Sequence, residues 1–213
     1  MNRETIVRQE TTDTLARVPT TEKETQETVN SSLSTLEIQN VVATSELGRE
    51  VDLETVASGL DRAEFTPEEF HRLKYQLESL AATSLVFRSG KMTCTDARSV
   101  EKVDEAITKA INAFQGLGIR VNSQDVTIQN IVSSANIGER LNLNAIAIGF
   151  GLKEVEYEPE QFPGLVSRPQ ESSIVVLLFE TEKTVITGAR THGGVEDGLK
   201  RVITRLEDLS LLG

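Results

Sequence analysis

The sequence has no tryptophan, a single cysteine and only two histidines, and these absences exclude several kinds of protein. Cys94 has no second cysteine with which to form an internal disulfide, which fits an intracellular, reducing location. His71 and His192 have no cysteine or histidine neighbours at the spacing of metal ligands. A Ser/His/Asp set and a phosphate-binding loop are also missing. We therefore expect a protein that is not an enzyme and that binds no cofactor and no metal.

Long hydrophobic runs are missing as well. No run approaches the ~20 apolar residues that a membrane-spanning helix needs, and the N-terminus lacks the apolar core of a secretory signal. We expect no membrane association and a cytoplasmic, nucleoid-associated location. The 213 residues leave room for one large domain or for two fused halves, and either could bury a hydrophobic core.

Basic residues are scarce. The chain has 22 of them against 33 acidic residues, for a net charge of −11. Taken alone, this balance argues against nucleic acid as a partner, because DNA-binding proteins usually carry a basic face. Arginine (14) outnumbers lysine (8) among the basic residues. An acidic, lysine-poor composition resembles that of proteins that work in molar salt.

The feature that the sequence does contain is an internal repeat. The segment Ile38–Val42 returns almost unchanged 90 residues later as Ile128–Val132. Further along, the offset becomes 92 residues, which indicates a two-residue insertion in the second copy. Two copies are too few for a solenoid. A duplicated module with pseudo-two-fold symmetry is the better interpretation, and duplex DNA is a partner with matching symmetry. We place the first repeat at residues 35–123 and the second at 124–213.

Residues 1–34 look different from both repeats. Threonine is abundant, charges are scattered and apolar periodicity is absent. A segment of such low hydrophobicity cannot offset its ordering entropy, so we expect a disordered N-terminal tail. The alternative is an interaction arm.

Each repeat has the same predicted order of strand, short helix, antiparallel strands and long helix. In the first repeat, Asp52 is a candidate N-cap of the short helix and Ser99 of the long one. The predicted strands of this repeat are 36–44, 70–76, 83–87 and 91–95, and those of the second include 125–133, 173–179 and 183–187. The pattern predicts an α+β fold in which one broad sheet has helices on one side. The opposite face then has no cover.

Side chains two residues apart on a strand share a face, so the residues of one repeated set, given at the end of this paragraph, lie together on one side of the sheet. If it faces away from the helices, the sheet exposes a contiguous apolar patch of the kind that marks a binding site. The alternatives are that the repeated phenylalanines belong to a duplicated core, that the asparagines bond local backbone, and that the threonines are ordinary strand residues. Cys94 should then point to the helix side as a packed thiol. The set consists of Asn40 with Val42, Leu85 with Phe87, Thr93 with Thr95, and their mates Asn130 with Val132, Leu177 with Phe179 and Val185 with Thr187.

Five motifs together resemble those of the archaeal and eukaryotic TATA-binding protein family, over about residues 36–209. They are IQNVVAT at 38–44, SGKMTCT at 89–95, IQNIVSS at 128–134, YEPEQFPGL at 157–165 and VITGAR at 185–190. The resemblance implies a pseudo-two-fold saddle made of a curved, ten-stranded antiparallel sheet with helices on its convex face. Its concave underside would bind the minor groove of A/T-rich promoter DNA and kink it by inserting phenylalanine. This mechanism is the family's own and follows from the resemblance alone.

The resemblance also assigns roles to residues of this chain. Phe70 with Phe87 and Phe162 with Phe179 would be the two wedge pairs. Asn40 and Asn130 would donate to minor-groove acceptors, with Thr95 and Thr187 beside them. The floor would be Val42, Val132, Leu85 and Leu177, and the cations near phosphates would be Lys91, Lys183, Arg98, Arg190 and Arg168. Glu158, Glu160 and Gln161 would lie in the loop that meets transcription factor B, which brings RNA polymerase indirectly. The exposed underside would also allow two copies of the free protein to form a homodimer.

Several residues depart from the family's pattern, mainly by removing positive charge. Asp96 stands where the family has glycine, Glu68 and Glu69 precede the first wedge, and Gln76 stands where arginine is usual. Glu171, Ser173 and Gln161 are further departures. The acidic departures around Phe70 and the unusual N-terminal tail favour an alternative in which the chain is a specialised paralogue that acts mainly through protein–protein contacts, with weakened DNA binding.

Overall fold

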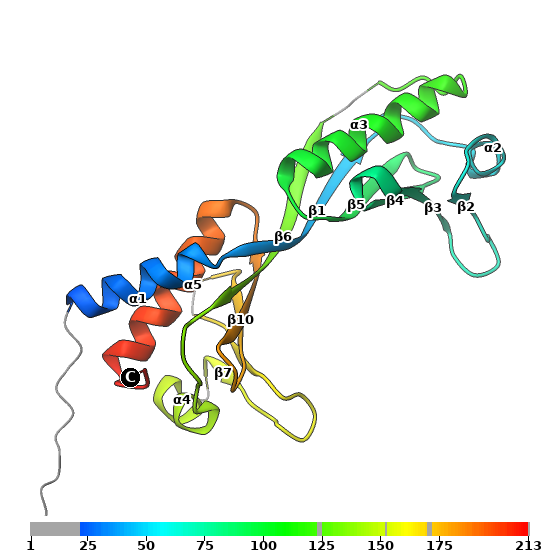
Figure 1. The fold of residues 1–213 in the computed structure, drawn as a ribbon. Helices are drawn as coiled ribbons and strands as arrows, with labels where there is room; N and C mark the ends of the chain where they lie inside the picture. Colours follow the sequence, from blue (N-terminus) through cyan, green and yellow to red (C-terminus); the bar gives the residue numbers. More distant parts are fainter. Residues whose placement is uncertain (1–21, 123–124, 152, 170–171, 213) are drawn as a thin grey trace, which may run out of the picture.

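The protein is a single curved sheet with helices along one side (Figure 1). The computed structural model describes residues 22–122, 125–151, 153–169 and 172–212. Within them, ten strands form one sheet in the order β2-β3-β4-β5-β1-β6-β10-β9-β8-β7, and every neighbouring pair is antiparallel. The α+β fold that the sequence pattern predicts and the ten-stranded antiparallel sheet that the resemblance implies are both confirmed.

The elements of the two repeats follow each other in the same order. The first repeat consists of β1 (Glu37–Glu46), α2 (Leu53–Gly59), β2 (Ala63–Glu64), β3 (Arg72–Leu77), the 3-10 helix η1 (Glu78–Leu80), β4 (Ala82–Phe87), β5 (Lys91–Ala97) and α3 (Val100–Gly116). The second consists of β6 (Val126–Asn136), α4 (Leu143–Phe150), β7 (Val155–Glu156), β8 (Leu165–Ser167), β9 (Val175–Leu178), β10 (Lys183–Ala189) and α5 (His192–Asp208). The two-residue edge strands β2 and β7, and the short β8, have no counterpart among the predicted strands.

The two repeats join through β1 and β6 at the middle of the sheet. In the antiparallel register, Val41 lies opposite Ile131, its own repeat mate. The neighbouring pairs are reciprocal, because Asn40 lies opposite Val132 and Val42 opposite Asn130. A pseudo-two-fold axis therefore passes between Val41 and Ile131. One continuous sheet with two equivalent ends follows from this pairing.

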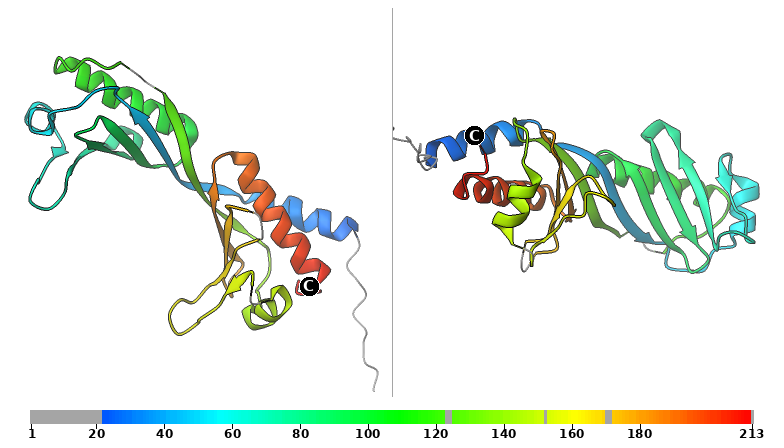
Figure 2. Two further views of the ribbon diagram at one scale, coloured as in Figure 1. Left: turned by 180° about the vertical axis from the view of Figure 1, so that it is seen from behind. Right: turned by 90° about the horizontal axis from the view of Figure 1, so that it is seen from below.

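The long helices α3 and α5 cover one face of the sheet, and no helix of the described residues covers the other, which we call the bare face. Strand residues alternate between the two faces, so that Val41 and Ala43 are buried while Val42 and Thr44 are half-buried. Cys94 is fully buried on the helix side, as the sequence predicts. Burial raises the pKa of its thiol, which disfavours the reactive thiolate. Seen from below (Figure 2, right), the strands of the first repeat lie in front of α3 with no helix across them.

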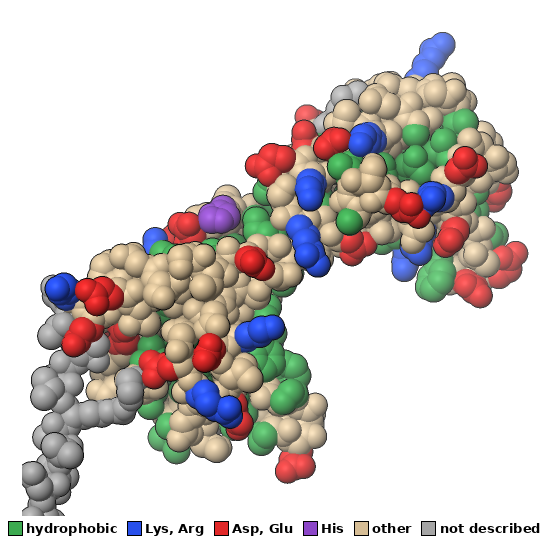
Figure 3. Space-filling model, viewed as in Figure 1, with side chains coloured by type: hydrophobic (Ala, Val, Ile, Leu, Met, Phe, Trp, Pro, Cys, Tyr) green, Lys and Arg blue, Asp and Glu red, His purple; other side chains and the backbone are tan. Residues whose placement is uncertain are grey.

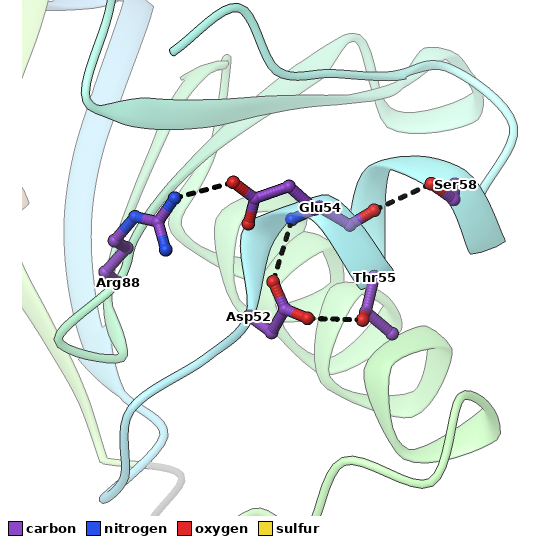
Figure 4. Close-up of polar contacts among 5 residues, drawn as sticks. All are labelled: Asp52, Glu54, Thr55, Ser58 and Arg88. Carbon is purple, nitrogen blue, oxygen red and sulfur yellow. Dashed lines mark hydrogen bonds and ion pairs between the residues drawn. The ribbon is translucent and has the colours of Figure 1, made fainter.

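The short helix α2 begins at the N-cap that the sequence predicts (Figure 4). One carboxylate oxygen of Asp52 accepts a bond from the backbone N–H of Glu54 and the other from the hydroxyl of Thr55. The hydrogen bonds from Thr55 and Glu54 hold the pKa of Asp52 below its ordinary value. The side chain of Glu54 accepts from Arg88, at 2.7 Å, which ties α2 to the turn after β4.

The prediction of a disordered tail over residues 1–34 is wrong for its last part. Residues Glu22–Ser34 form a helix, α1, that lies beside α5 (Figure 1). Val29 is 5% exposed in the hydrophobic core, and Leu33 packs against that core. Thr35 exchanges two hydrogen bonds with the backbone of Asn136 and fixes the start of β1. The sequence-based prediction missed α1 because one buried valine and one leucine make only a weak helical pattern of apolar residues. Residues 1–21 lie outside the described residues.

We expect Val29→Asp to detach α1 while the sheet stays folded, because an unpaired carboxylate cannot be buried between α1 and α5 without a large cost. Hydrogen exchange should show that amides of residues 23–34 lose protection while those of β1 and β6 keep theirs. Asn30→Asp adds the same charge at an exposed position of α1 and should leave the exchange unchanged. Full protection of α1 in Val29→Asp would contradict the packing described.

Candidate nucleic-acid interface

The centre of the bare face is built from four of the predicted site residues around the pseudo-two-fold axis. Asn40 and Val132 face each other across β1 and β6, and Val42 and Asn130 do the same. All four are half-buried. The centre therefore presents two amides and two apolar side chains in a symmetric arrangement.

The two asparagine amides are held in one orientation by hydrogen bonds across the sheet. The side-chain oxygen of Asn40 accepts from the backbone N–H of Asp96 at 2.8 Å and from the hydroxyl of Thr95 at 3.3 Å. The oxygen of Asn130 accepts in the same way from Gly188 at 2.8 Å and from Thr187 at 3.2 Å. A flipped amide would lose the backbone bond. The NH₂ group is thus the end that can donate to a ligand on this face, and that of Asn130 also donates one of its two hydrogens to the hydroxyl of Thr187 at 3.0 Å.

The backbone N–H that holds each asparagine comes from a residue with positive φ. Asp96 has φ of 73° and Gly188 has φ of 89°. Aspartate tolerates this left-handed region better than most residues, so the first repeat keeps the geometry without glycine. The second repeat cannot keep this geometry without glycine, since a Cβ at Gly188 would lie 2.0 Å from the carbonyl oxygen of Ser173. The departure at Asp96 adds a carboxylate to the face but preserves the hold on Asn40.

Two glutamines belong to the same surface and were missed by the sequence-based prediction. Gln39 donates to the hydroxyl of Ser134 at 2.9 Å, and Gln129 donates to the hydroxyl of Thr44 at 2.8 Å. Strict alternation places Gln39 on the helix side, but the β1–β6 register shifts between Ile38 and Asn40 and turns it away. The identical letters of the two IQN motifs were the signal that could have revealed them.

The floor extends from this centre along both repeats. Leu85 and Thr95 in the first repeat, and Leu177 and Thr187 in the second, are half-buried on the bare face. A groove of about 510 Å³ follows the first repeat between Thr44, Phe87, Lys91 and Gln129. The face thus combines apolar side chains with amides and hydroxyls and is open to solvent.

The four repeated phenylalanines lie at the two ends of this floor, outside the helical layer. Phe70 is 51% exposed, Phe162 39% and Phe87 36%, and Phe179 is half-buried. The prediction that these rings are exposed is confirmed for Phe70, Phe87 and Phe162, and the alternative of a duplicated core is wrong for all four, because Phe179 is half-buried and lies outside the core. Figure 3 shows hydrophobic side chains, with acidic ones near them, at the lower ends of both repeats.

Equivalent loops present one ring at each end. In the first repeat, the N–H of Phe70 donates to the carbonyl oxygen of Thr66 at 2.9 Å. In the second, the N–H of Phe162 donates to the carbonyl oxygen of Glu158 at 3.0 Å. The same backbone turn therefore aims both rings, although the loop sequences differ.

The two aromatic pairs differ in packing. Phe162 and Phe179 meet edge to face, with their centroids 5.9 Å apart. Both rings pass over Gly164, where a Cβ would lie 2.7 Å from Phe162 and 2.9 Å from Phe179. In the first repeat, Phe70 instead has the guanidinium of Arg72 over its ring, 4.8 Å from the centroid. The second pair is preformed and the first pair is more open.

The predicted phosphate-contacting cations are all exposed. Lys91 lies 3.8 Å from Glu46, and Arg168 lies 3.2 Å from Glu156. Arg190 lines a hollow of about 710 Å³ together with Asn130 and Thr187. The remaining two predicted cations are Arg98 and Lys183. Exposed ion pairs of this kind stabilise a fold by only ~0–1 kcal/mol, so these cations can turn to a ligand at small cost.

The loop between β7 and β8 carries the predicted partner-binding residues. Glu158, Glu160 and Gln161 are all exposed, and Gln161 donates to the carboxylate of Glu158. The loop is therefore accessible from outside the sheet. Among the other residues that depart from the family's pattern, Glu171 lies outside the described residues.

Neither a metal site nor a membrane span is found in the described part of the chain. No group of three or more His, Cys, Asp or Glu residues is arranged to hold a metal ion there. None of the helices described combines the length and the hydrophobicity that crossing a membrane requires.

Comparisons with known proteins agree with this geometry. The profile of the family described as transcription factor TFIID, or TATA-binding protein, matches residues 35–117 and 125–209. The chain is 47% identical over 179 residues to TATA-box-binding protein 2 of Haloferax volcanii, covering 84% of this chain and 96% of that one. It is 48% identical over 185 residues to TATA-box-binding protein F of Halobacterium salinarum, covering 86% and 100%. The solved structure of Methanococcus jannaschii TBP superimposes with a TM-score of 0.74 at 40% identity, covering 82% of this chain and 99% of that one.

We expect Gly188→Ala to destabilise the protein by at least about 2 kcal/mol, through a left-handed backbone and a clash with Ser173. Asp96→Gly at the equivalent position should change stability by less than about 1 kcal/mol, because Asp96 already adopts that conformation. Urea unfolding of both variants measures the difference. Equal losses in the two variants would contradict the close approach at Gly188.

Proposed function

The chain belongs to the family of transcription factor TFIID, or TATA-binding protein, and we propose that it is a general transcription initiation factor that binds the minor groove of A/T-rich promoter DNA. The observation that carries this proposal is the bare face, which has amide donors at its centre and exposed aromatic pairs at both ends. The pseudo-two-fold axis at Val41 and Ile131 matches the approximate two-fold symmetry of a duplex.

The chemistry of the centre fits A·T base pairs. In the minor groove, A·T and T·A pairs present only acceptors, whereas G·C pairs add an amino donor. The oriented amides of Asn40 and Asn130 supply donors, and the side chains of Val42 and Val132 offer no acceptor for an amino group. We propose that these four residues select A/T over G/C without separating A·T from T·A.

We propose that the aromatic pairs insert at the two ends of the element and kink the DNA. Partial unstacking of a base step by an apolar wedge costs free energy, and the contacts that the bent duplex makes with more of the protein offset this cost. This family is itself a standard example of that mechanism. The exposure of Phe70, Phe87 and Phe162 supports the step, since wedge rings must be accessible before DNA arrives.

We further propose that the DNA-bound protein recruits transcription factor B, and RNA polymerase through it. The exposed β7–β8 loop with Glu158, Glu160 and Gln161 is the surface for that contact. Before DNA binds, the apolar floor could pair two copies, and we propose a homodimer for the free protein. The site of action would be the nucleoid in the cytoplasm.

A second candidate function is that of a specialised paralogue that works mainly through protein contacts. The observation that favours it is the pair of exposed acidic residues beside the first wedge, Glu68 and Glu69. Under this alternative, the phenylalanines would contribute little to DNA affinity.

Replacing the second wedge, with Phe162→Ala plus Phe179→Ala, separates the two functions. We expect at least tenfold weaker binding to an A/T-rich duplex at high KCl, a loss of about 1.4 kcal/mol, together with a smaller bend. Gel shift and end-to-end energy transfer on the duplex measure both. Ile148→Ala plus Leu209→Ala removes exposed apolar side chains away from the bare face and should change neither. Unchanged binding by the wedge variant would favour the paralogue.

The acidic surface leads to a prediction about salt. Basic contacts gain affinity by counterion release, and this gain disappears as salt rises. At 1 M salt the screening length is ~3 Å, so the net charge of −11 repels DNA weakly. We expect binding to hold steady or strengthen as KCl rises toward molar levels, because wedge insertion and apolar contact remain. A steep loss of affinity above physiological salt in a KCl titration would rule this account out.

A further inference from the structure

The two ends of the bare face differ at two positions of equivalent strands. Arg72 of β3 lies opposite Phe87, and Lys74 lies opposite Leu85. In the second repeat, 92 residues later, Gly164 and Val166 take these places, and Val166 lies opposite Leu177. One end of the floor therefore carries two cations where the other carries a glycine and a valine.

Both cations belong to the DNA-facing side of the sheet. Leu73 and Leu77 of the same strand are buried under the helices, at 0% and 7% exposed, so Arg72 and Lys74 alternate to the opposite face. Both are half-buried, and they line a hollow of about 260 Å³ with Phe70 and Leu85. We call this place the β3 subsite and define it by Arg72 and Lys74.

In the free protein, Lys74 lies beside acidic side chains and Arg72 lies over an aromatic ring. The ammonium of Lys74 lies 3.7 Å from Glu64, with side chains 43% and 66% exposed, and Glu69 lines the same hollow. The guanidinium of Arg72 stacks on Phe70. These are exposed, screened contacts, which a polyanion can replace at small cost.

The equivalent strand of the second repeat carries its cation at a different position. Glu156, the repeat mate of Glu64, pairs with Arg168 at 3.2 Å, and the mate of Arg168 is Gln76. The first repeat thus has no cation at Gln76, but it has Lys74 and Arg72, two and four residues closer to the wedge on the same strand. The positive charge of this strand therefore lies closer to the end of the floor than it does in the second repeat.

We propose that the β3 subsite binds the DNA phosphates beside the step entered by Phe70 and Phe87, and that it thereby sets which way round the protein lies on the DNA. This inference rests on the proposed DNA-binding function and deepens it. The second end binds without cations at the matching positions, because Phe162 and Phe179 are preformed over Gly164. The first end has an open wedge and depends on phosphate contact. A duplex whose two ends differ in phosphate charge is therefore bound in one preferred orientation.

The test uses a self-complementary A/T element in which the phosphates at one end are replaced by neutral methylphosphonates. The probe is a dye on Ser58→Cys, an exposed position of α2 at the first-repeat end, and Cys94 is buried and does not take the label. An acceptor dye on either DNA end reports orientation by energy transfer. Measurements are made on the full chain, at 0.2 M and at 2 M KCl.

We expect the first repeat to lie on the charged end in at least about fivefold excess at 0.2 M KCl, with a smaller excess at 2 M. Arg72→Gly plus Lys74→Val copies the second repeat and should bring the ratio close to one. Arg72→Gln plus Lys74→Gln keeps the side-chain bulk and should do the same, which guards against a folding defect. The slope of log affinity against log salt concentration should shift by about one to two units in the positive direction in both variants, because two phosphate contacts are lost.

Lys102→Ala plus Lys109→Ala removes two exposed cations from α3, on the opposite face, and should keep the preference. Wild-type protein that binds the duplex with no orientation preference, or variants that keep it, would overturn the β3 subsite alone. Wild-type protein that binds no A/T duplex at either salt concentration would overturn the proposed function and the subsite with it.

Discussion

The antiparallel pairing of β1 with β6 is the constraint on which the rest of the structure depends. Because Val41 meets its own repeat mate Ile131, the two copies share a symmetric seam and close into one sheet. The same register brings both asparagines and both valines to the centre of the bare face. A shift of one residue would turn all four toward the helices, since neighbouring strand residues face opposite sides. The seam therefore fixes the fold and the candidate interface together.

Symmetry in the backbone leaves room for asymmetry in the side chains. The hydrogen bond that orients each asparagine survives with Asp96 in one repeat and Gly188 in the other, because only the second position lies against a neighbouring carbonyl. The wedges differ more, since one pair packs over Gly164 and the other opens beside Arg72. The chain thus keeps a two-fold frame for a two-fold partner and differentiates the ends by a few residues. The charge of the strand next to each wedge is the clearest of these differences.

Much of this could be predicted from the sequence, because duplication doubles every weak signal. The IQN motifs located the first strand of each repeat, alternation placed Asn40 and Val42 on one face, and the resemblance to the family placed the repeated phenylalanines at the ends. Three features could not be read in the same way. The strand irregularity at Gln39 breaks alternation locally, and α1 depends on docking against α5 rather than on its own periodicity. Arg72 and Lys74 look like ordinary surface charges until the register sets them opposite Phe87 and Leu85.

The central claim is that aromatic side chains at both ends of the bare face enter base steps of an A/T-rich duplex. Fluorescence of 2-aminopurine, placed in turn at each end step and at the middle of the element, tests it directly. In molar KCl, the account predicts that saturating protein raises the fluorescence at both end steps, where bases unstack, and leaves the middle position little changed. Bound protein that leaves both end steps stacked would contradict the account.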